Sequence, residues 1–172
     1  MLKFIRNLIL TSIAGLLTAS NAFAGATPQT TTFLVSATVG KSCLVTATAL
    51  AFGTYDQLAG TNTTGTSTVN LQCTNGTVAT MALSGGVYGT LAQRKMKDSV
   101  SANLLNYQLY TTTGNTAVWG DGTGTTVTQA YTSASPVTVQ PFTVNGTIPL
   151  GQNVLSSTSN TYQDTITVTV TF

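Results

Sequence analysis

The last eleven residues, 162–172, alternate apolar and polar side chains with a period of two. Successive side chains of a β-strand point to opposite faces, so this segment would have one apolar face and one polar face. The apolar face carries Ile166, Val168, Val170 and Phe172. Because the sequence ends on this core-type strand, we expect its free edge to be covered by a strand from another molecule.

The first 24 residues are typical of a secretory signal peptide. Lys3 and Arg6 precede an apolar run at 8–17, and the small-residue pattern 22–24 precedes Gly25. The apolar run is shorter than the roughly 20 residues of a membrane-spanning helix, so we predict export without a membrane anchor. Cleavage after residue 24 would leave a chain of roughly 150 residues, the length of one domain.

The charges of the chain exclude several classes of function. After the signal peptide the basic and acidic residues balance, so we expect no nucleic-acid partner. The chain has no histidine and no glutamate, and we therefore predict no enzyme, no cofactor and no metal site. Three of the four basic residues fall within 94–97, and we interpret the cluster 94–98 as a solvated loop rather than as a subunit contact or a segment that packs Met96 into the core. The eight charges are Lys41, Arg94, Lys95, Lys97, Asp56, Asp98, Asp121 and Asp164.

Short segments rich in β-branched residues recur about every ten residues, with glycine-containing turns between them. No helical periodicity follows the signal peptide. This pattern predicts an all-β fold, an antiparallel β-sandwich of immunoglobulin-like type. The expected strands lie within 30–39, 43–52, 66–73, 78–83, 104–111, 127–131, 137–144 and 162–172.

Cys43 and Cys73 are the two cysteines of the chain. In an exported protein, thiols are normally oxidised, so we expect one disulfide between them. Closing a loop of about 30 residues would stabilise the fold by about 3.5 kcal/mol. The alternatives are two free thiols or half of a metal site, which no histidine or further cysteine completes.

Trp119 allows two interpretations. Together with Tyr110, the glycine-rich loop 120–124 and Asp121, it would form an exposed aromatic platform for a carbohydrate. Alternatively, it plugs the interior of the sandwich, and this second interpretation is the one that we favour.

Several short motifs, in this order and at these spacings, make the chain resemble the spore coat protein U domain family. The best understood branch of that family comprises the subunits of archaic chaperone-usher pili. The motifs are Cys43 with 44–45, Phe52-Gly53-Thr54-Tyr55, Val69 with Leu71 and Cys73, Gly85-Gly86, Arg94-Lys95-Met96, Leu105 with Tyr107, Leu109-Tyr110, Trp119-Gly120, Ile148-Pro149 with Gly151-Gln152, and Tyr162 and Asp164 with 165–172.

The resemblance implies an incomplete immunoglobulin-like sandwich that lacks its last strand and is completed by donor-strand exchange. Residues 25–40 would be the donor-strand extension, and residues 41–172 the pilin-type domain. The donor strand would insert alternate side chains into a neighbouring subunit. These donor side chains are Phe33, Val35, Ala37 and Val39, and the edge of the acceptor groove is Ile166, Val168, Val170 and Phe172.

The implied function is a secreted subunit of a pilus that takes part in surface attachment and biofilm formation. Its partners would be identical or related pilin subunits, a periplasmic chaperone and an outer-membrane usher. The protein would pass through the periplasm to the cell surface. The alternatives are a spore or cell-surface coat protein of the same fold, and a carbohydrate-binding surface adhesin. Because the adhesins at the tips of such pili usually carry a second domain, for which we expect no room here, we favour the pilus subunit.

Overall fold

A computed structural model describes residues 25, 27–156 and 161–172. The expected signal peptide, residues 1–24, lies outside the described residues. The chain divides into two units, Met1–Ala37 and Thr38–Phe172. In the first unit, the described residues form neither helix nor strand, and their side chains are exposed. No helix in the described part of the chain is long and apolar enough to cross a membrane.

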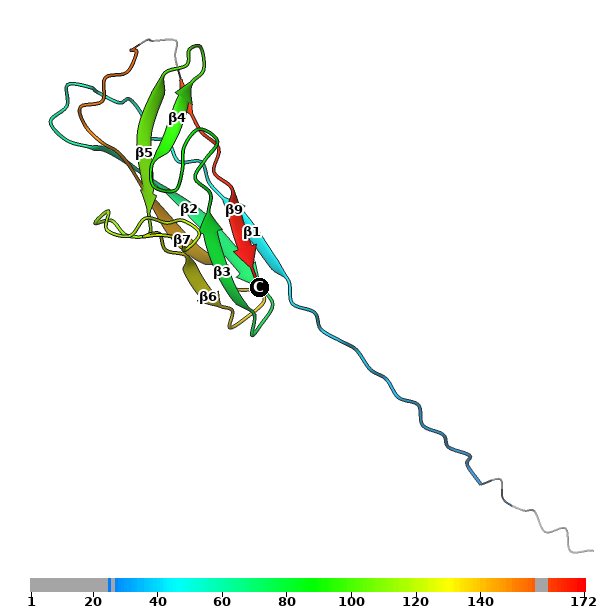
Figure 1. The fold of residues 1–172 in the computed structure, drawn as a ribbon. Coiled ribbons are helices and arrows are strands. Elements are labelled where there is room, and N and C mark those ends of the chain that lie inside the picture. The colour runs from blue at the N-terminus through cyan, green and yellow to red at the C-terminus, as the bar shows by residue number, and fades with distance from the viewer. Residues whose placement is uncertain (1–24, 26, 157–160) are drawn as a thin grey trace, which may run out of the picture. The chain divides into compact units, whose positions relative to one another are not determined.

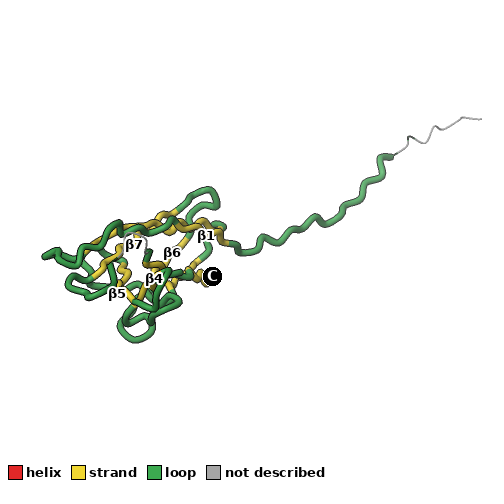
Figure 2. The backbone as a smooth tube through the Cα atoms, turned by 90° about the horizontal axis from the view of Figure 1, so that it is seen from above, coloured by secondary structure: helices red, strands yellow, loops and turns green. Residues whose placement is uncertain are grey.

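The described residues of the second unit are all-β, as predicted, and contain strands and loops (Figure 2). The expected strand at 78–83 is observed with the same bounds, and most of the others are shifted by a few residues. The strands are β1 (Cys43–Ala47), β2 (Thr63–Cys73), β3 (Val78–Leu83), β4 (Arg94–Asp98), β5 (Leu104–Tyr110), β6 (Gln129–Thr132), β7 (Gln140–Ile148), β8 (Tyr162–Gln163) and β9 (Val168–Thr171).

These strands form two sheets (Figure 1). The larger has six strands in the order β1-β2-β7-β5-β4-β8, and the smaller has three in the order β6-β3-β9. Every pairing between these strands is antiparallel. Because β1 and β9 each stand at the end of their sheet, each has one edge without a neighbouring strand among the described residues.

Inward-facing side chains of both sheets form one hydrophobic core. Along β2 and β3 buried residues alternate with more exposed ones, as expected for strands with one face on a core. Trp119 belongs to this core, with 0% of its surface exposed, and its indole N–H donates to the carbonyl oxygen of Met81 at 3.2 Å. The preferred interpretation of Trp119 as an interior plug is therefore confirmed, and the exposed aromatic platform is wrong.

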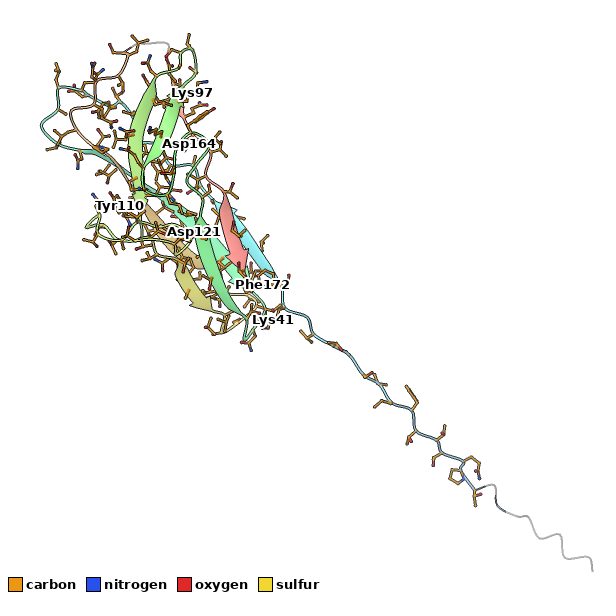
Figure 3. The ribbon with its side chains drawn as sticks, in the orientation of Figure 1. Lys41, Lys97, Tyr110, Asp121, Asp164 and Phe172 are labelled. Carbon is orange, nitrogen blue, oxygen red and sulfur yellow. A yellow bond between two sulfur atoms is a disulfide. The ribbon has the colours of Figure 1, made fainter. Side chains whose placement is uncertain are left out.

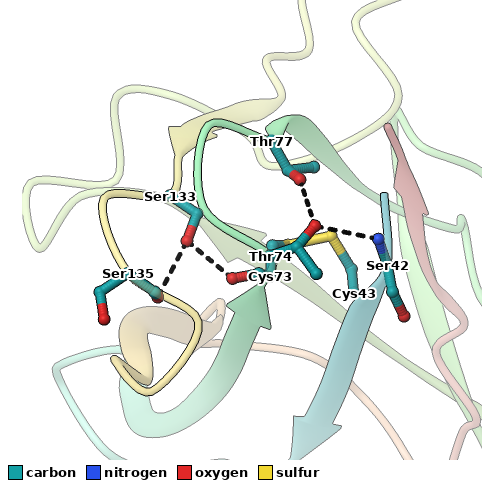
Figure 4. The surroundings of a disulfide bond; sticks show 7 residues. All are labelled: Ser42, Cys43, Cys73, Thr74, Thr77, Ser133 and Ser135. Atoms are coloured by element: carbon teal, nitrogen blue, oxygen red, sulfur yellow. Dashed lines mark hydrogen bonds between the residues drawn. A yellow bond between two sulfur atoms is a disulfide. The ribbon is translucent and has the colours of Figure 1, made fainter. Parts of the chain in front are cut away.

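The predicted disulfide between Cys43 and Cys73 is present and ties the start of β1 to the end of β2 (Figure 4). Next to it, the backbone N–H of Thr74 donates to the carbonyl oxygen of Ser42 at 2.9 Å, and the Ser42 N–H donates to the Thr74 hydroxyl at 3.2 Å. Ser42, the residue at which the N-terminal segment joins the domain, is thus anchored to the end of β2. We call this end of the domain the base.

The segment Arg94–Asp98 is not the solvated loop that its charges suggested. It forms β4, which pairs with β5, and Arg94 is fully buried. The Arg94 guanidinium donates to the carbonyl oxygens of Ser84 and Trp119 at 2.7–2.9 Å and to the Gln108 side-chain oxygen. Because a guanidinium carries five N–H donors in a planar fork, these neutral acceptors can hold it inside the core.

Two further expectations about strands are corrected. Residues 30–39 form no strand, because no neighbouring backbone pairs with them in the single chain. Residues 162–172 are not one strand but two, β8 and β9, which belong to different sheets. The chain crosses from one sheet to the other through residues 164–167.

Candidate functional site

A groove of about 600 Å³ lies between the end of β1 and the segment that leads into β9. One wall is formed by residues 47–50 and the other by residues 163–168. The first wall starts at Ala47, the last residue of β1, and the second ends at Val168, the first residue of β9. Among the described residues, each of these two strands has one edge without a neighbouring strand. The groove therefore adjoins two strands that each end a sheet, and a strand at the end of a sheet can accept an added strand.

The floor of the groove is part of the hydrophobic core. It includes side chains from both sheets, and Phe52 packs there edge-to-face on Tyr107 with 6.1 Å between the ring centroids. The partly buried side chains among them, such as Leu50 and Met96, stay in partial contact with water until something covers them. The apolar and aromatic lining residues are Leu50, Phe52, Val69, Leu83, Val87, Tyr88, Met96, Tyr107, Leu109, Val144, Tyr162, Ile166 and Val168.

The residues predicted for the groove edge alternate in exposure along the final segment. Ile166, Val168 and Val170 are each half-buried, whereas the threonines between them are exposed. Phe172 keeps 50% of its surface exposed. The apolar face of this segment thus faces the core but is only partly buried. By contrast, inward residues of strand β2 such as Leu71, with 0% of its surface exposed, are fully buried.

Asp164 lies at the upper end of this face and lines the groove (Figure 3). Its carboxylate accepts hydrogen bonds from the Val87 and Thr165 N–H groups, each at 2.8 Å, and from the Tyr107 hydroxyl at 2.6 Å. Burial, aided by the bond to Asp164, raises the pKa of Tyr107 far above its usual value, so the phenol remains a proton donor. These bonds fix the point where the chain crosses between the sheets.

Gly86 allows this arrangement by two features. Its φ of +83° lies in the left-handed region, and a Cβ at this position would come within 1.9 Å of an Asp164 carboxylate oxygen. The Asp164 side chain therefore occupies the space that a side chain on residue 86 would need.

Arg94 stands behind this cluster on the core side. Its pKa is lowered from the ordinary value by burial, and the charge of Asp164 is one of the two influences that oppose this shift. The hydrogen bonds of the guanidinium go to neutral oxygens, as described above. The Asp164 carboxylate is consequently attracted by the more distant Arg94 charge on the core side, and it also lines the groove.

The residues predicted as donor plugs are accessible in the single chain. Phe33, Val35 and Val39 are 84%, 78% and 89% exposed, and Ala37 is exposed as well. Such apolar side chains in water are an energetic cost that burial in a partner would remove.

Sequence reasoning missed the polar cluster around Asp164 and the contribution of Leu50, Phe52 and Tyr107 to the floor. The partners of Asp164, Tyr107 and Val87, are 57 and 77 residues away in sequence. The motif 52–55 and the pair Leu105 and Tyr107 were signals of the family, but nothing local indicated that they share one groove.

The comparison with family models matches the Spore Coat Protein U domain to residues 29–169. Among curated proteins, the chain is similar to Protein U of Myxococcus xanthus. The two are 35% identical over 185 aligned positions, which cover 96% of this chain and 99% of that protein.

Among solved structures, the chain is similar to a chain of the complex between the chaperone CsuC and the tip adhesion subunit CsuE. That complex is a pre-assembly complex from the archaic chaperone-usher Csu pili of Acinetobacter baumannii. The TM-score is 0.56 and the identity 25%, over 78% of this chain. The match spans 41% of the length of the solved chain.

Proposed function

The chain belongs to the Spore Coat Protein U domain family, and we propose that it is an exported structural subunit that polymerises by donor-strand exchange into an archaic chaperone-usher pilus. In this proposal the domain is an immunoglobulin-like sandwich that lacks its last strand. The extension at residues 25–40 of one subunit supplies that strand to the next. The fibre stands on the cell surface and serves attachment and biofilm formation.

One observation carries the proposal: the groove adjoins β1 and β9, which among the described residues each have one edge without a neighbouring strand, and the hydrophobic core forms its floor. The same chain has an exposed segment in which every second residue from Phe33 to Val39 is apolar. In a strand these residues span about 20 Å. The surface that needs a strand and the strand that fits it therefore occur in one molecule.

The magnitudes favour exchange between molecules. Burying Phe33, Val35 and Val39 contributes roughly 1.5–3 kcal/mol each, with less from Ala37. Each new ladder hydrogen bond adds about 1 kcal/mol net. The inserted strand also covers the floor of the groove, which removes more apolar surface from water. Because donor and acceptor surfaces differ, the contact repeats into an open fibre rather than closing as a dimer.

The open groove also implies the assembly partners. A subunit with two bare strand edges beside an exposed core is prone to aggregate, so we expect a periplasmic chaperone to lend a strand until exchange occurs. An outer-membrane usher would then pass the subunit to the growing fibre. The solved relative comes from a chaperone and subunit pre-assembly complex, which supports this order of events.

The decisive experiment deletes residues 25–39 and co-expresses the shortened chain with its chaperone and usher. We expect it to co-purify with the chaperone and to form no fibres by electron microscopy, because the acceptor groove remains while the donor is gone. The matched control replaces residues 25–32 with a Gly/Ser sequence of equal length and should assemble normally. Normal fibres from the shortened chain would overturn the proposal.

A coat layer is the second candidate, since the similar protein of Myxococcus xanthus matches over nearly its whole length. A coat would use the same strand exchange on a different surface. Immunogold labelling separates the two, because a pilus subunit labels along filaments and a coat protein labels a continuous layer.

A further inference from the structure

The acceptor face and the donor segment carry a matched pattern that extends beyond the apolar residues. In the final segment, the inward side chains Ile166, Val168, Val170 and Phe172 are preceded at the same spacing by Asp164. In the extension, the plugs Phe33, Val35, Ala37 and Val39 are followed at the same spacing by Lys41. Each segment thus has four apolar positions and one charge. The negative charge precedes the apolar positions in the final segment, and the positive charge follows them in the extension.

Resting on the proposed function, we infer that the donor strand inserts antiparallel to β9 in one register, fixed by an ion pair between Lys41 of one subunit and Asp164 of the next. Residues directly opposite each other in an antiparallel pair share a face of the sheet. With Lys41 opposite Asp164, the four plugs fall opposite the four apolar residues of the final segment, of which Ile166 and Val168 line the groove. The pairs are Val39 with Ile166, Ala37 with Val168, Val35 with Val170 and Phe33 with Phe172.

The opposite direction does not produce this match. In a parallel insertion with Phe33 beside Ile166, the plugs still face the groove, but Thr31 then lies level with Asp164. Lys41 would then lie at the Phe172 end of the segment, far from Asp164. The half-buried carboxylate would then be covered with no cation on its groove side, and the more distant charge of Arg94 would have to offset its desolvation alone.

Asp164 has room for a further donor. A carboxylate can accept about four hydrogen bonds, and the bonds from Val87, Thr165 and Tyr107 use two positions on Oδ1 and one on Oδ2. These three bonds hold the side chain in place, in the space that Gly86 leaves free. A lysine ammonium that arrives from the groove side therefore meets an acceptor whose position is already set.

Lys41 is placed to make this contact. It is exposed in the single chain, and it immediately precedes Ser42, which is hydrogen-bonded to Thr74 at the base of its own domain. The ion pair would therefore form at the junction between the donor strand and the domain that supplies it. It would bring the base of one subunit to the Asp164 end of the groove of the next, which is a head-to-tail arrangement.

Cysteine pairs in the full-length chain test the register directly. With Ala37→Cys and Val168→Cys in the same chain, oxidised fibres should give a ladder of covalent multimers on non-reducing gels. The matched pair, Ala37→Cys with Val170→Cys, fits the parallel insertion and should cross-link at least tenfold less. A stronger ladder from the second pair overturns the inferred register while leaving strand exchange intact, whereas absence of fibres from the parent chain would overturn the proposed function itself.

A double-mutant cycle tests the ion pair. Lys41→Ala and Asp164→Asn should each raise the subunit concentration needed for assembly by roughly tenfold, and the double variant should be no worse than either single one. Lys41→Arg should restore assembly, while Lys95→Glu, a charge reversal outside the groove, should leave it unchanged. Additive effects of the two single changes would overturn the ion pair, and so would a Lys41→Ala chain that assembles like its parent. If Asp164→Asn impairs folding, the Lys41 series and the cysteine pairs still decide.

Discussion

The alternation of the donor segment makes a sharp prediction about neighbouring residues. Phe33 and Leu34 are almost equally exposed in the single chain, at 84% and 89%. In the fibre Phe33 would face the groove of the next subunit, and Leu34 would face away from it. Fully burying a phenylalanine side chain is worth roughly 1.5–3 kcal/mol. Truncation of Phe33 to alanine should therefore weaken the subunit contact by about 2 kcal/mol, roughly 30-fold in the equilibrium constant.

The change Leu34→Ala removes a similar apolar side chain from the same strand but from the opposite face. Its expected effect is within about 0.5 kcal/mol, as for other exposed positions. Purified fibres of both variants and of the parent are incubated in increasing guanidinium chloride, and released subunits are measured in the supernatant after sedimentation. We expect the midpoint to fall for Phe33→Ala and to remain near the parent value for Leu34→Ala. Equal losses for the two variants would refute the assignment of the inward face, and a loss confined to Leu34→Ala would reverse it.

Three further predictions concern the domain itself. The change Arg94→Ala should lower the free energy of unfolding by roughly 3–5 kcal/mol, because it leaves buried acceptors unpaired and a cavity behind. Urea denaturation of the subunit in its complex with the chaperone measures this, and a loss below about 1 kcal/mol would contradict the buried network. Replacing Cys43 and Cys73 by serine should cost about 3.5 kcal/mol in the same assay, and reduction of the parent should have a similar effect. The hydrogen bond from Ser101 is the main cause that lowers the pKa of Asp98. A carboxyl whose pKa is lowered by folding stabilises the fold at pH values above its ordinary pKa of 3.8, and this contribution disappears as the pH falls through the lowered pKa. The Ser101→Ala variant should therefore be less stable than the parent at pH 7 and equally stable in acid. A stability difference that is the same at all pH values would show that the loss does not come from the ionisation of Asp98.

Several elements could be predicted because local rules determine them. The strand at 78–83 begins after the Asn75-Gly76 turn, and Gly76 has the φ of +74° that such a turn requires. Its alternation then needs only a core on one face. The disulfide followed from export and from having two cysteines. These inferences required no knowledge of which strands become neighbours.

The errors share one physical cause, which is contact between distant parts of the chain. Charges at 94–98 indicated a solvated loop, but the acceptors that hold Arg94 in the core are carbonyl oxygens 10 and 25 residues away, together with Gln108. The final segment looked like one strand because its alternation continues through the crossing at 164–167. The break comes from Asp164, whose hydrogen bonds to Tyr107 and Val87 cannot be deduced from sequence spacing.

The polar end of the groove also solves a problem that apolar plugs alone leave open. A strand that slips by two residues keeps the same side chains on the same face, so a uniform apolar pattern specifies the face but specifies the register only weakly. The plugs Val35, Ala37 and Val39 are similar in size, so exchanging one for another changes the packing against half-buried Val168 and Val170 only a little. The pair of Lys41 and Asp164 specifies the register more strongly than the apolar plugs do. A slip of two residues places the lysine ammonium beside Ile166 or moves it past the carboxylate, and in both cases the ion pair is lost. In a domain with so few charges, one pair at the end of the apolar run is sufficient to distinguish the correct register from its neighbours.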